Sequence, residues 1–428
     1  MPSLPRTLQT FGLATLLTAC GAKTGLEDRF PSAPLGDAGL TDTQPTDPDV
    51  IIQTPPSPVM CGSTAREHCV VQAVSTYTAT VPSTATSDTS APFYSSVCAL
   101  MADGHVKIRG HRINGTAITT VPELHDIVYA DGNNESLLAF VGRDGSVWVW
   151  GHNEAPLGPN IPLHPRTGMT GIHGDAADRP SRIDGLMNIV QIVAGRYHLL
   201  ALDKGGNVYA WGENTSGQLG NGTRLESDNP TRIEGLPPIQ ILRAGWTESV
   251  ALDRQGRVWT WGQGLPTTPE QCMSASVTND RPILNPEIPG SVRDVHTMGG
   301  DYFALNSAGQ LYAWGCNQSG WIGDGNRTAH LSPIQIFSGA RITFFNAYYT
   351  SALALSSSHQ VFEWGDMESS RTTGQTRPTL VPDLPDNIVS LDAGYINHRV
   401  AITRDGIVYV WGDAASFGEG RPPTRVEF

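Results

Sequence analysis

Residues 194–223 contain seven glycines around the tetrapeptide Tyr209-Ala-Trp-Gly212, which is the composition of a candidate phosphate-binding loop. Such loops hold phosphate with closely spaced backbone N–H groups, which glycine leaves accessible. The chain contains neither of the two common phosphate-loop patterns, Gly-x-x-x-x-Gly-Lys-Ser/Thr and Gly-x-Gly-x-x-Gly. The glycines therefore predict turns and close packing rather than a phosphate site.

Other catalytic and metal-binding patterns are absent from the sequence, which has no His-Glu-x-x-His, no Gly-x-Ser-x-Gly and no Cys-x-x-Cys. His198 and His398 occupy equivalent repeat positions, where a structural hydrogen bond is a better explanation than acid–base catalysis. The acidic segments 131–135 and 324–326 could bind calcium, but they lack the spacing of an EF-hand loop, and turn formation explains them equally well. We therefore expect a non-enzymatic protein with no cofactor and no metal site.

The end of the glycine-rich stretch recurs along the chain at a period of about 50 residues. Six copies end in Trp-Gly, and a seventh has Arg109 in place of the tryptophan. The closing glycines are Gly110, Gly151, Gly212, Gly262, Gly315, Gly365 and Gly412. Self-similarity at such a period is typical of a repeat architecture.

Each copy predicts four β-strands. In one copy, residues 189–193, 198–202 and 208–211 are apolar segments, and a Gly-containing turn joins the last two, as in a β-hairpin. A proline and an alternating segment follow, as in Pro230-Thr-Arg-Ile, and proline suits an edge strand. Seven such units predict an all-β, seven-bladed β-propeller of four-stranded blades, with the tryptophans as packing anchors between blades.

The pattern Ala-Gly…Leu-Ala-Leu…Gly-x-Val-Tyr-x-Trp-Gly…Gly-Gln-Leu-Gly resembles the regulator of chromosome condensation repeat, and copy 194–223 matches it nearly throughout. The resemblance covers residues 95–428 and implies a seven-bladed propeller. Some copies depart from it. The first two lack a clean Gly-Gln-Leu-Gly, the copy after residue 364 has MESSRTTGQ instead, and another has Gly320-Trp-Ile-Gly323.

The founding member of that family is a nuclear nucleotide-exchange factor that also binds chromatin. No residue here matches its exchange apparatus, and the net charge of −13 leaves no excess of the basic residues that supply most nucleic-acid affinity. We therefore expect no nucleic-acid partner. Other members of the repeat family are binding proteins, and the fold by itself does not decide the function.

The N-terminus resembles an export signal. Arg6 precedes an apolar run that ends in Leu17-Thr-Ala-Cys20, and with Gly21 this looks like a bacterial lipobox, which implies a lipidated Cys20. An ordinary signal peptide is the alternative. Residues 21–60 are rich in proline, aspartate and threonine and predict a disordered tether, which leaves 61–428 for the propeller. We expect a lipid-anchored bacterial envelope protein, in the outer membrane or at the cell surface.

The first unit has no proline strand ahead of it. We expect the C-terminal segment 423–428 to supply the outer strand of the first blade and so to close the ring. An exported chain can form disulfides, and we predict the pairs Cys61–Cys69 and Cys272–Cys316. Cys98 falls on an apolar strand, which predicts a buried free thiol.

The remaining candidate site is a surface. In a four-stranded blade the loops after strands one and three emerge on the same face, and large side chains in such loops are common in recognition sites. The candidates are Arg196, Tyr197, Trp246, Tyr348, Tyr349 and Tyr395 from the first set of loops and Trp321 and Glu213 from the second. The alternative is that these rings cap the blades near the axis.

Three classes of function fit this sequence. The first is a monomeric scaffold that binds an unidentified protein partner, the second is a glycan-binding protein, and the third is an enzyme with an unfamiliar site. No paired carboxylates or nucleophile–base set favours the third.

Overall fold

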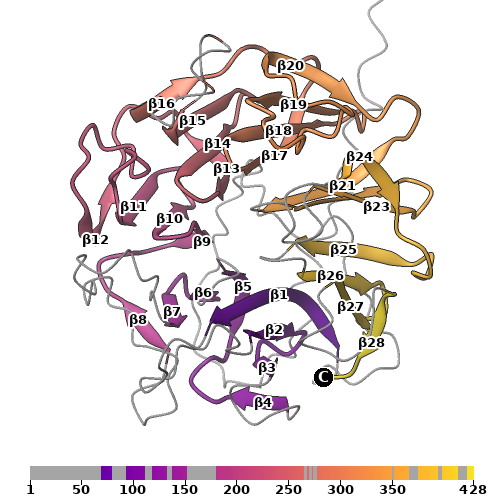
Figure 1. Ribbon diagram of the computed structural model, residues 1–428. Coiled ribbons are helices and arrows are strands. Elements are labelled where there is room, and N and C mark those ends of the chain that lie inside the picture. The colour runs from indigo at the N-terminus through magenta and orange to yellow at the C-terminus, as the bar shows by residue number, and fades with distance from the viewer. Residues whose placement is uncertain are drawn as a thin grey trace, which may run out of the picture. The chain divides into compact units, whose positions relative to one another are not determined.

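The computed structural model describes residues 69–79, 93–110, 118–132, 137–151, 180–264, 268, 272, 277–348, 351–365, 375–393, 398–412 and 422–428. All of them belong to one compact unit, Asp49–Phe428. They form seven antiparallel four-stranded sheets around a common axis, so the predicted all-β, seven-bladed propeller is confirmed (Figure 1).

Each blade uses four consecutive strands, and its first strand lies nearest the centre of the ring (Figure 1). The first four blades comprise β1 Val70–Ala79, β2 Phe93–Met101, β3 Val106–Gly110 and β4 Ile118–Val121; β5 Ile127–Gly132, β6 Leu137–Gly142, β7 Val147–Gly151 and β8 Ser181–Ile183; β9 Ile189–Ala194, β10 His198–Asp203, β11 Val208–Gly212 and β12 Ser227–Arg232; β13 Ile239–Ala244, β14 Glu248–Asp253, β15 Val258–Gln263 and β16 Thr278–Leu284. The last three comprise β17 Val292–Met298, β18 Asp301–Asn306, β19 Leu311–Gly315 and β20 His330–Ile336; β21 Ile342–Tyr348, β22 Ser351–Ser356, β23 Val361–Gly365 and β24 Gln375–Leu380; β25 Ile388–Ala393, β26 His398–Thr403, β27 Val408–Gly412 and β28 Thr424–Val426.

The second strands are the most deeply buried because a neighbouring blade packs on each face. Strand β18 is buried at every position, whereas the outer strand β12 alternates between half-buried and exposed residues. The prolines predicted at outer strands lie there, for example Pro230 in β12 and Pro378 in β24. An outer strand tolerates proline because one of its edges has no ladder to join.

The repeated tryptophans lie between blades, as predicted. Trp261 and Trp364 are fully buried, and each indole N–H donates to a carbonyl in the Gly-x-x-Gly loop of the preceding blade. The acceptors are Gln218 O and Trp321 O, each at 2.8 Å. The Gly-Gln-Leu-Gly motif is therefore a clasp in which one blade holds the tryptophan of the next.

Two blades that depart from the motif supply a side-chain acceptor to the next tryptophan instead. Trp314 Nε1 donates to Asn285 Oδ1 at 3.3 Å, and Trp411 Nε1 donates to Glu363 Oε2 at 3.0 Å. The same carboxylate pairs with the buried guanidinium of Arg399 at 2.8 Å. In these two cases a side chain of the preceding blade takes the place of the clasp loop.

The predicted ring closure is wrong. The C-terminal strand β28 pairs with β27 of its own blade and not with the first blade. The first blade is complete without it because β1 supplies its innermost strand. Residues Val70–Val74, with the sequence Val-Val-Gln-Ala-Val, lie ahead of the first recognisable repeat.

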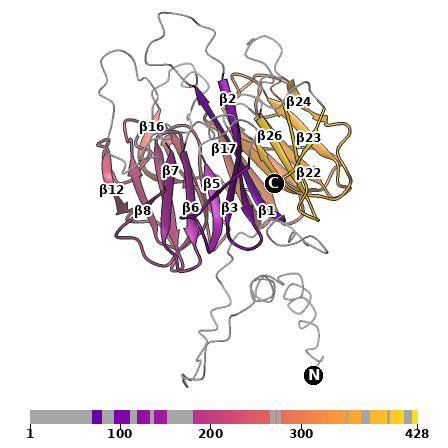
Figure 2. The same ribbon diagram turned by 90° about the horizontal axis from the view of Figure 1, so that it is seen from below.

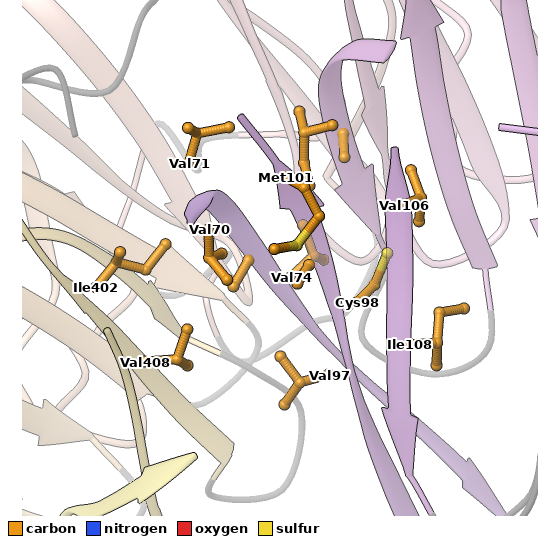
Figure 3. Packing of buried hydrophobic residues seen from close by; sticks show 14 of the residues in the cluster. Val70, Val71, Val74, Val97, Cys98, Met101, Val106, Ile108, Ile402 and Val408 are labelled. Atoms are coloured by element: carbon orange, nitrogen blue, oxygen red, sulfur yellow. The ribbon is translucent and has the colours of Figure 1, made fainter. Parts of the chain in front are cut away.

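Hydrophobic packing closes the ring instead. Val70, Val74 and Val97 of the first blade share one buried cluster with Ile402 and Val408 of the last (Figure 3). The fully buried, unpaired Cys98 belongs to the same cluster, as predicted, and burial raises the pKa of its thiol well above the usual range.

Candidate functional site

The predicted recognition loops lie on one face of the propeller, which we call the loop face. Among the described residues it comprises turns between the first and second strands of the blades, including 195–197, 245–247 and 299–300, and the loops 213–226 and 316–329 that follow third strands. The opposite face carries tight turns between the second and third strands, such as 203–207 and 253–257.

Arg196, Tyr197 and Trp246 form one cluster on the loop face. The guanidinium carbon of Arg196 lies 4.7 Å from the centroid of the Tyr197 ring and 4.2 Å from the Trp246 ring. Arg196 N donates to Gly245 O at 3.2 Å, which joins the turns of two adjacent blades. Tyr197 is buried, whereas Arg196 and Trp246 are half-buried. The arginine is therefore held by cation–π contacts between two rings.

Two glycines make this close approach possible. A Cβ atom on Gly195 would lie 2.2 Å from the His198 imidazole and 2.8 Å from Gly245 O. A Cβ atom on Gly245 would lie 2.4 Å from the Glu248 carboxylate. Any larger residue would push the two turns apart and separate Arg196 from Trp246.

Buried polar side chains support the cluster from below. Ser249 Oγ donates to Gln218 O at 3.0 Å and therefore accepts from His198 Nε2 at 2.9 Å. Burial lowers the pKa of His198 to about 3, so the ring is neutral. His198 thus makes the structural hydrogen bond expected from the sequence, while the side chain of His398 lies outside the described residues.

Glu248 connects the fourth and fifth blades. Its fully buried carboxylate accepts from Thr247 N at 2.9 Å, from Gly300 N at 3.2 Å and from Thr297 Oγ1 at 3.3 Å. Asp301 starts the second strand of the next blade and accepts from Asn317 N at 2.8 Å, and burial raises the pKa of its carboxyl to about 7. These bonds fix the turns of the third, fourth and fifth blades beneath the cluster.

The other candidates are divided between the surface and the core. Glu213 lies beside the cluster, since its N–H donates to Tyr197 O at 2.8 Å. Trp321 is half-buried and covers Gly299, where an added Cβ would lie 2.3 Å from its ring. Tyr348 is buried in a hydrophobic cluster, which fits the alternative that some rings cap the blades. Tyr349 and Tyr395 lie outside the described residues.

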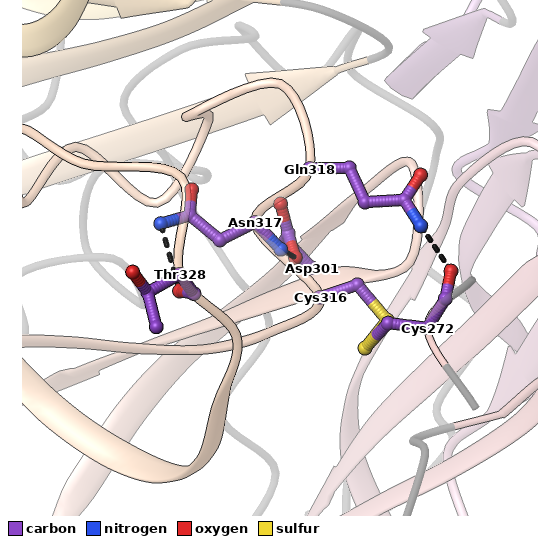
Figure 4. The surroundings of a disulfide bond; sticks show 6 residues. All are labelled: Cys272, Asp301, Cys316, Asn317, Gln318 and Thr328. Atoms are coloured by element: carbon purple, nitrogen blue, oxygen red, sulfur yellow. Dashed lines mark hydrogen bonds between the residues drawn. A yellow bond between two sulfur atoms is a disulfide. The ribbon is translucent and has the colours of Figure 1, made fainter. Parts of the chain in front are cut away.

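The predicted disulfide between Cys272 and Cys316 is present, with a Cα–Cα distance of 5.4 Å. It joins the loops that follow Trp-Gly in the fourth and fifth blades, and the Gln318 amide donates to Cys272 O beside it (Figure 4). Cys69 is also disulfide-bonded. Cys61 and Cys20 lie outside the described residues, so the Cys61–Cys69 pair stays a prediction.

The candidate calcium segments have structural roles where they are described. Asp324 Oδ2 lies 2.6 Å from His330 Nε2, and Asp324 Oδ1 accepts from Asn326 N at 3.0 Å. Residues 133–135 of the other segment lie outside the described ranges. Among the residues that the structure describes, no three His, Cys, Asp or Glu side chains gather as metal ligands, and no helix is long and apolar enough to span a membrane.

Polar side chains around the axis were missed by the sequence analysis. Gln191 Nε2 donates to Leu242 O at 3.1 Å, and Gln191 Oε1 accepts from Leu242 N at 2.9 Å. Gln72 makes the same two bonds with Ala130, at 2.5 and 3.1 Å. In each case an amide caps the inner edge of the next blade, which would otherwise leave backbone groups unpaired. The only signal in the sequence was a polar residue inside an apolar strand.

Other blades use carboxylate and amide oxygens for the same purpose. Asp131 Oδ2 accepts from Ala194 N at 2.9 Å, and Asn346 Oδ1 accepts from Ala393 N at 3.2 Å. Each acceptor lies on the first strand of one blade, and each donor ends the first strand of the next. The caps therefore all point the same way around the axis.

Charge is also concentrated at the axis. Arg243 Nη2 lies 3.0 Å from Asp294 Oδ1, which links the fourth and fifth blades. Burial, and to a smaller degree the Asp392 carboxylate, raises the pKa of Asp131 to about 7. These groups bind one another and the backbone, so they act as a polar core.

The fold is a seven-bladed β-propeller, and parts of it match the regulator of chromosome condensation (RCC1) repeat. Family models with that description match residues 189–218, 205–252 and 308–347.

Several curated relatives and solved structures are similar to this chain. Human Protein RCC2 is 28% identical over 315 residues, which cover 65% of this chain and 57% of RCC2. The human E3 ubiquitin-protein ligase HERC2 is 27% identical over 330 residues, which cover 73% of this chain and 6% of HERC2. The chain thus spans little more than half of one relative and a small part of the other. Yeast RCC1 (Prp20), solved bound to Kap60, matches with a TM-score of 0.58 at 20% identity over 73% of this chain and 78% of that one, which shows the shared fold.

Proposed function

We propose that this chain is a non-enzymatic binding module that recognises a protein partner through the loop face, while a lipid on Cys20 anchors it at the bacterial cell envelope. RCC1-like propellers are typically protein-binding scaffolds, and yeast RCC1 was solved in complex with another protein, Kap60. That precedent supports the class of function and leaves the partner of this chain to be identified.

The observation that carries the proposal is the cluster of Arg196, Tyr197 and Trp246. Arginine, tyrosine and tryptophan are the residues that most often dominate the energy of protein interfaces. Here the guanidinium is already stacked between two rings. The turns are fixed by buried hydrogen bonds that His198 makes with Ser249 and that Glu248 accepts from Gly300 N. A preorganised cluster loses little side-chain entropy on binding, and its planar guanidinium suits a carboxylate of the partner.

The disulfide supports the envelope location. A bond such as Cys272–Cys316 persists in oxidising compartments and is rare in the bacterial cytosol. Together with the Leu17-Thr-Ala-Cys20 sequence, it supports an exported chain. Replacement of Cys20 by serine should abolish incorporation of labelled palmitate and release the protein from membranes. Unchanged labelling would contradict the anchor without touching the binding proposal.

The binding proposal is tested with full-length protein purified from membranes. Envelope and secreted proteins that it retains are identified by mass spectrometry, and the affinity of the best one is then measured by calorimetry. An Arg196→Ala/Trp246→Ala variant should bind at least about tenfold more weakly, as expected when two central interface residues are truncated. Met187→Ala is the matched control, since Met187 is 78% exposed in the connection between β8 and β9 on the opposite face.

The same variants separate protein binding from glycan recognition. Arg196 already covers one face of the Trp246 ring, so that face is closed to a stacking sugar. Retention of the parent on envelope polysaccharide, lost in the double variant, would favour the glycan function. Equal binding by parent and double variant to every protein and polysaccharide would contradict a site on the loop face.

A further inference from the structure

The hairpin of the first blade is longer than those of the other blades. In the third blade, β9 ends at Ala194, opposite Leu199. The equivalent residue of the first blade is Ser75, opposite Val97, yet β1 continues to Ala79 and pairs there with Phe93 (Figure 2). We call Thr76–Ala79 together with Phe93–Ser96 the arm. Four extra residues extend it by about 13 Å on the loop face.

The arm has two strands where the rest of the blade has four. Strand β3 pairs with β2 only from Ser96 to Leu100, so Phe93–Ser95 have no partner besides β1 among the described strands. The free edge of β1 likewise has no partner strand among them. An unpaired edge is a template for another strand, and a two-stranded ribbon is only marginally stable by itself.

Three of the usual protections of an edge, namely proline, charge and a bulge, are missing from the arm. Residues 75–79 and 93–96 contain no proline and no charged residue, and the only register shift in this hairpin lies far below, between Val70 and Gln72. Between residues 70 and 102 the sole charged residue is Asp88, in a chain whose net charge is −13. The arm thus adds no charge of its own that would repel a second acidic molecule.

The sequence of the edge is self-complementary. Ser75-Thr-Tyr-Thr-Ala79 reads almost the same in both directions about Tyr77. When two identical strands pair antiparallel about that residue, Thr76 of each copy stands opposite Thr78 of the other. Threonine opposite threonine is a favourable cross-strand pair, and a two-fold axis makes both such pairs form at once.

We propose that the arm binds a second copy of this chain by antiparallel pairing of the two β1 edges about Tyr77. This differs from the monomer expected from the sequence, and it does not depend on the proposed function. The length of the arm, about 13 Å, exceeds the Debye length of about 8 Å at physiological ionic strength, so the acidic bodies repel each other weakly across it.

The test is sedimentation equilibrium of the purified full-length protein over a range of concentrations. The parent should show a reversible monomer–dimer equilibrium. Thr76→Lys/Thr78→Lys places lysine opposite lysine twice and should weaken the dimer at least about tenfold. Thr76→Lys/Thr78→Glu places opposite charges at the same two positions and should restore the dimer.

Two controls make the outcome decisive. Met187→Lys adds one charge on the opposite face and should leave the equilibrium unchanged. Equal melting temperatures of the two arm variants at a dilution where both are monomeric would show that neither loses its dimer through unfolding. A parent that stays monomeric at all concentrations would overturn the proposal, and so would arm variants with equal dimer affinities.

Discussion

Gly220 offers the sharpest test of the interblade clasp. It lies in the Gly-Gln-Leu-Gly loop with a φ of +64°, and a Cβ atom there would lie 2.8 Å from the Trp261 indole. Gly235 has a φ of +85° and no neighbour within 4 Å of its Cβ position. Replacement of each by alanine therefore adds the same backbone strain, while only Gly220→Ala disturbs the clasp.

The two substitutions should differ by several kcal/mol. The left-handed conformation costs alanine about 1–2 kcal/mol, partly offset by the reduced freedom of the unfolded chain, so Gly235→Ala should destabilise by about 1 kcal/mol. Gly220→Ala adds overpacking of about 1–3 kcal/mol. It also loses the Trp261–Gln218 hydrogen bond, worth about 1 kcal/mol. We expect a total of about 3–5 kcal/mol.

Guanidinium unfolding, followed by tryptophan fluorescence and circular dichroism, measures both variants. A lower midpoint at unchanged slope reports a loss of stability. Equal midpoints for Gly220→Ala and Gly235→Ala would refute the clasp, because strain alone would then explain both.

Three further predictions concern the disulfide, the buried histidine and the axial caps. Replacement of Cys272 and Cys316 by serine should lower stability by about 2–4 kcal/mol, and a thiol reductant should lower the melting temperature of the parent and not of the variant. The pKa of His198 falls from 6.5 to about 3 on folding, so its contribution to stability is fully present above pH 6.5 and is lost as the pH falls toward 3. His198→Gln should flatten that limb of the pH–stability curve, and an unchanged limb would count against a buried neutral ring. Gln191→Leu leaves two backbone groups of Leu242 unpaired and should cost about 2–4 kcal/mol in chemical unfolding, whereas the exposed Gln360→Leu should be neutral.

The repeats made most of the fold predictable from the sequence. Each Trp-Gly, each Gly-containing turn and each outer-strand proline is a local signal, and together they predicted the blades. Strand β1 was missed because Val70–Val74 lies ahead of the first repeat and has no tryptophan to mark it. The error in ring closure followed from that omission, since a first blade without β1 needs a strand from elsewhere.

The candidate site was predictable only in part. The sequence predicts both Trp246 and Tyr348 in the turn that follows a first strand. Tyr348 is instead the last residue of β21 and packs in the core. Trp246 lies past the end of β13 and is half-buried. A shift of one or two positions at a strand end decides between these outcomes. The axial caps join residues about 50 positions apart, as Gln191 and Leu242 do, and such pairs leave no local pattern.

The way in which the ring closes also determines how such a chain can evolve. Among the described strands, every blade consists of four that are consecutive in the sequence, and none is exchanged between the first blade and the last. A gene duplication or deletion that begins and ends in the connections between blades therefore adds or removes a complete sheet. In a ring closed by a shared strand, the same event at either terminus would leave one sheet unfinished. This chain can thus inherit its blades as whole units, and each new unit needs only a polar residue to cap its neighbour and a loop to hold the next tryptophan.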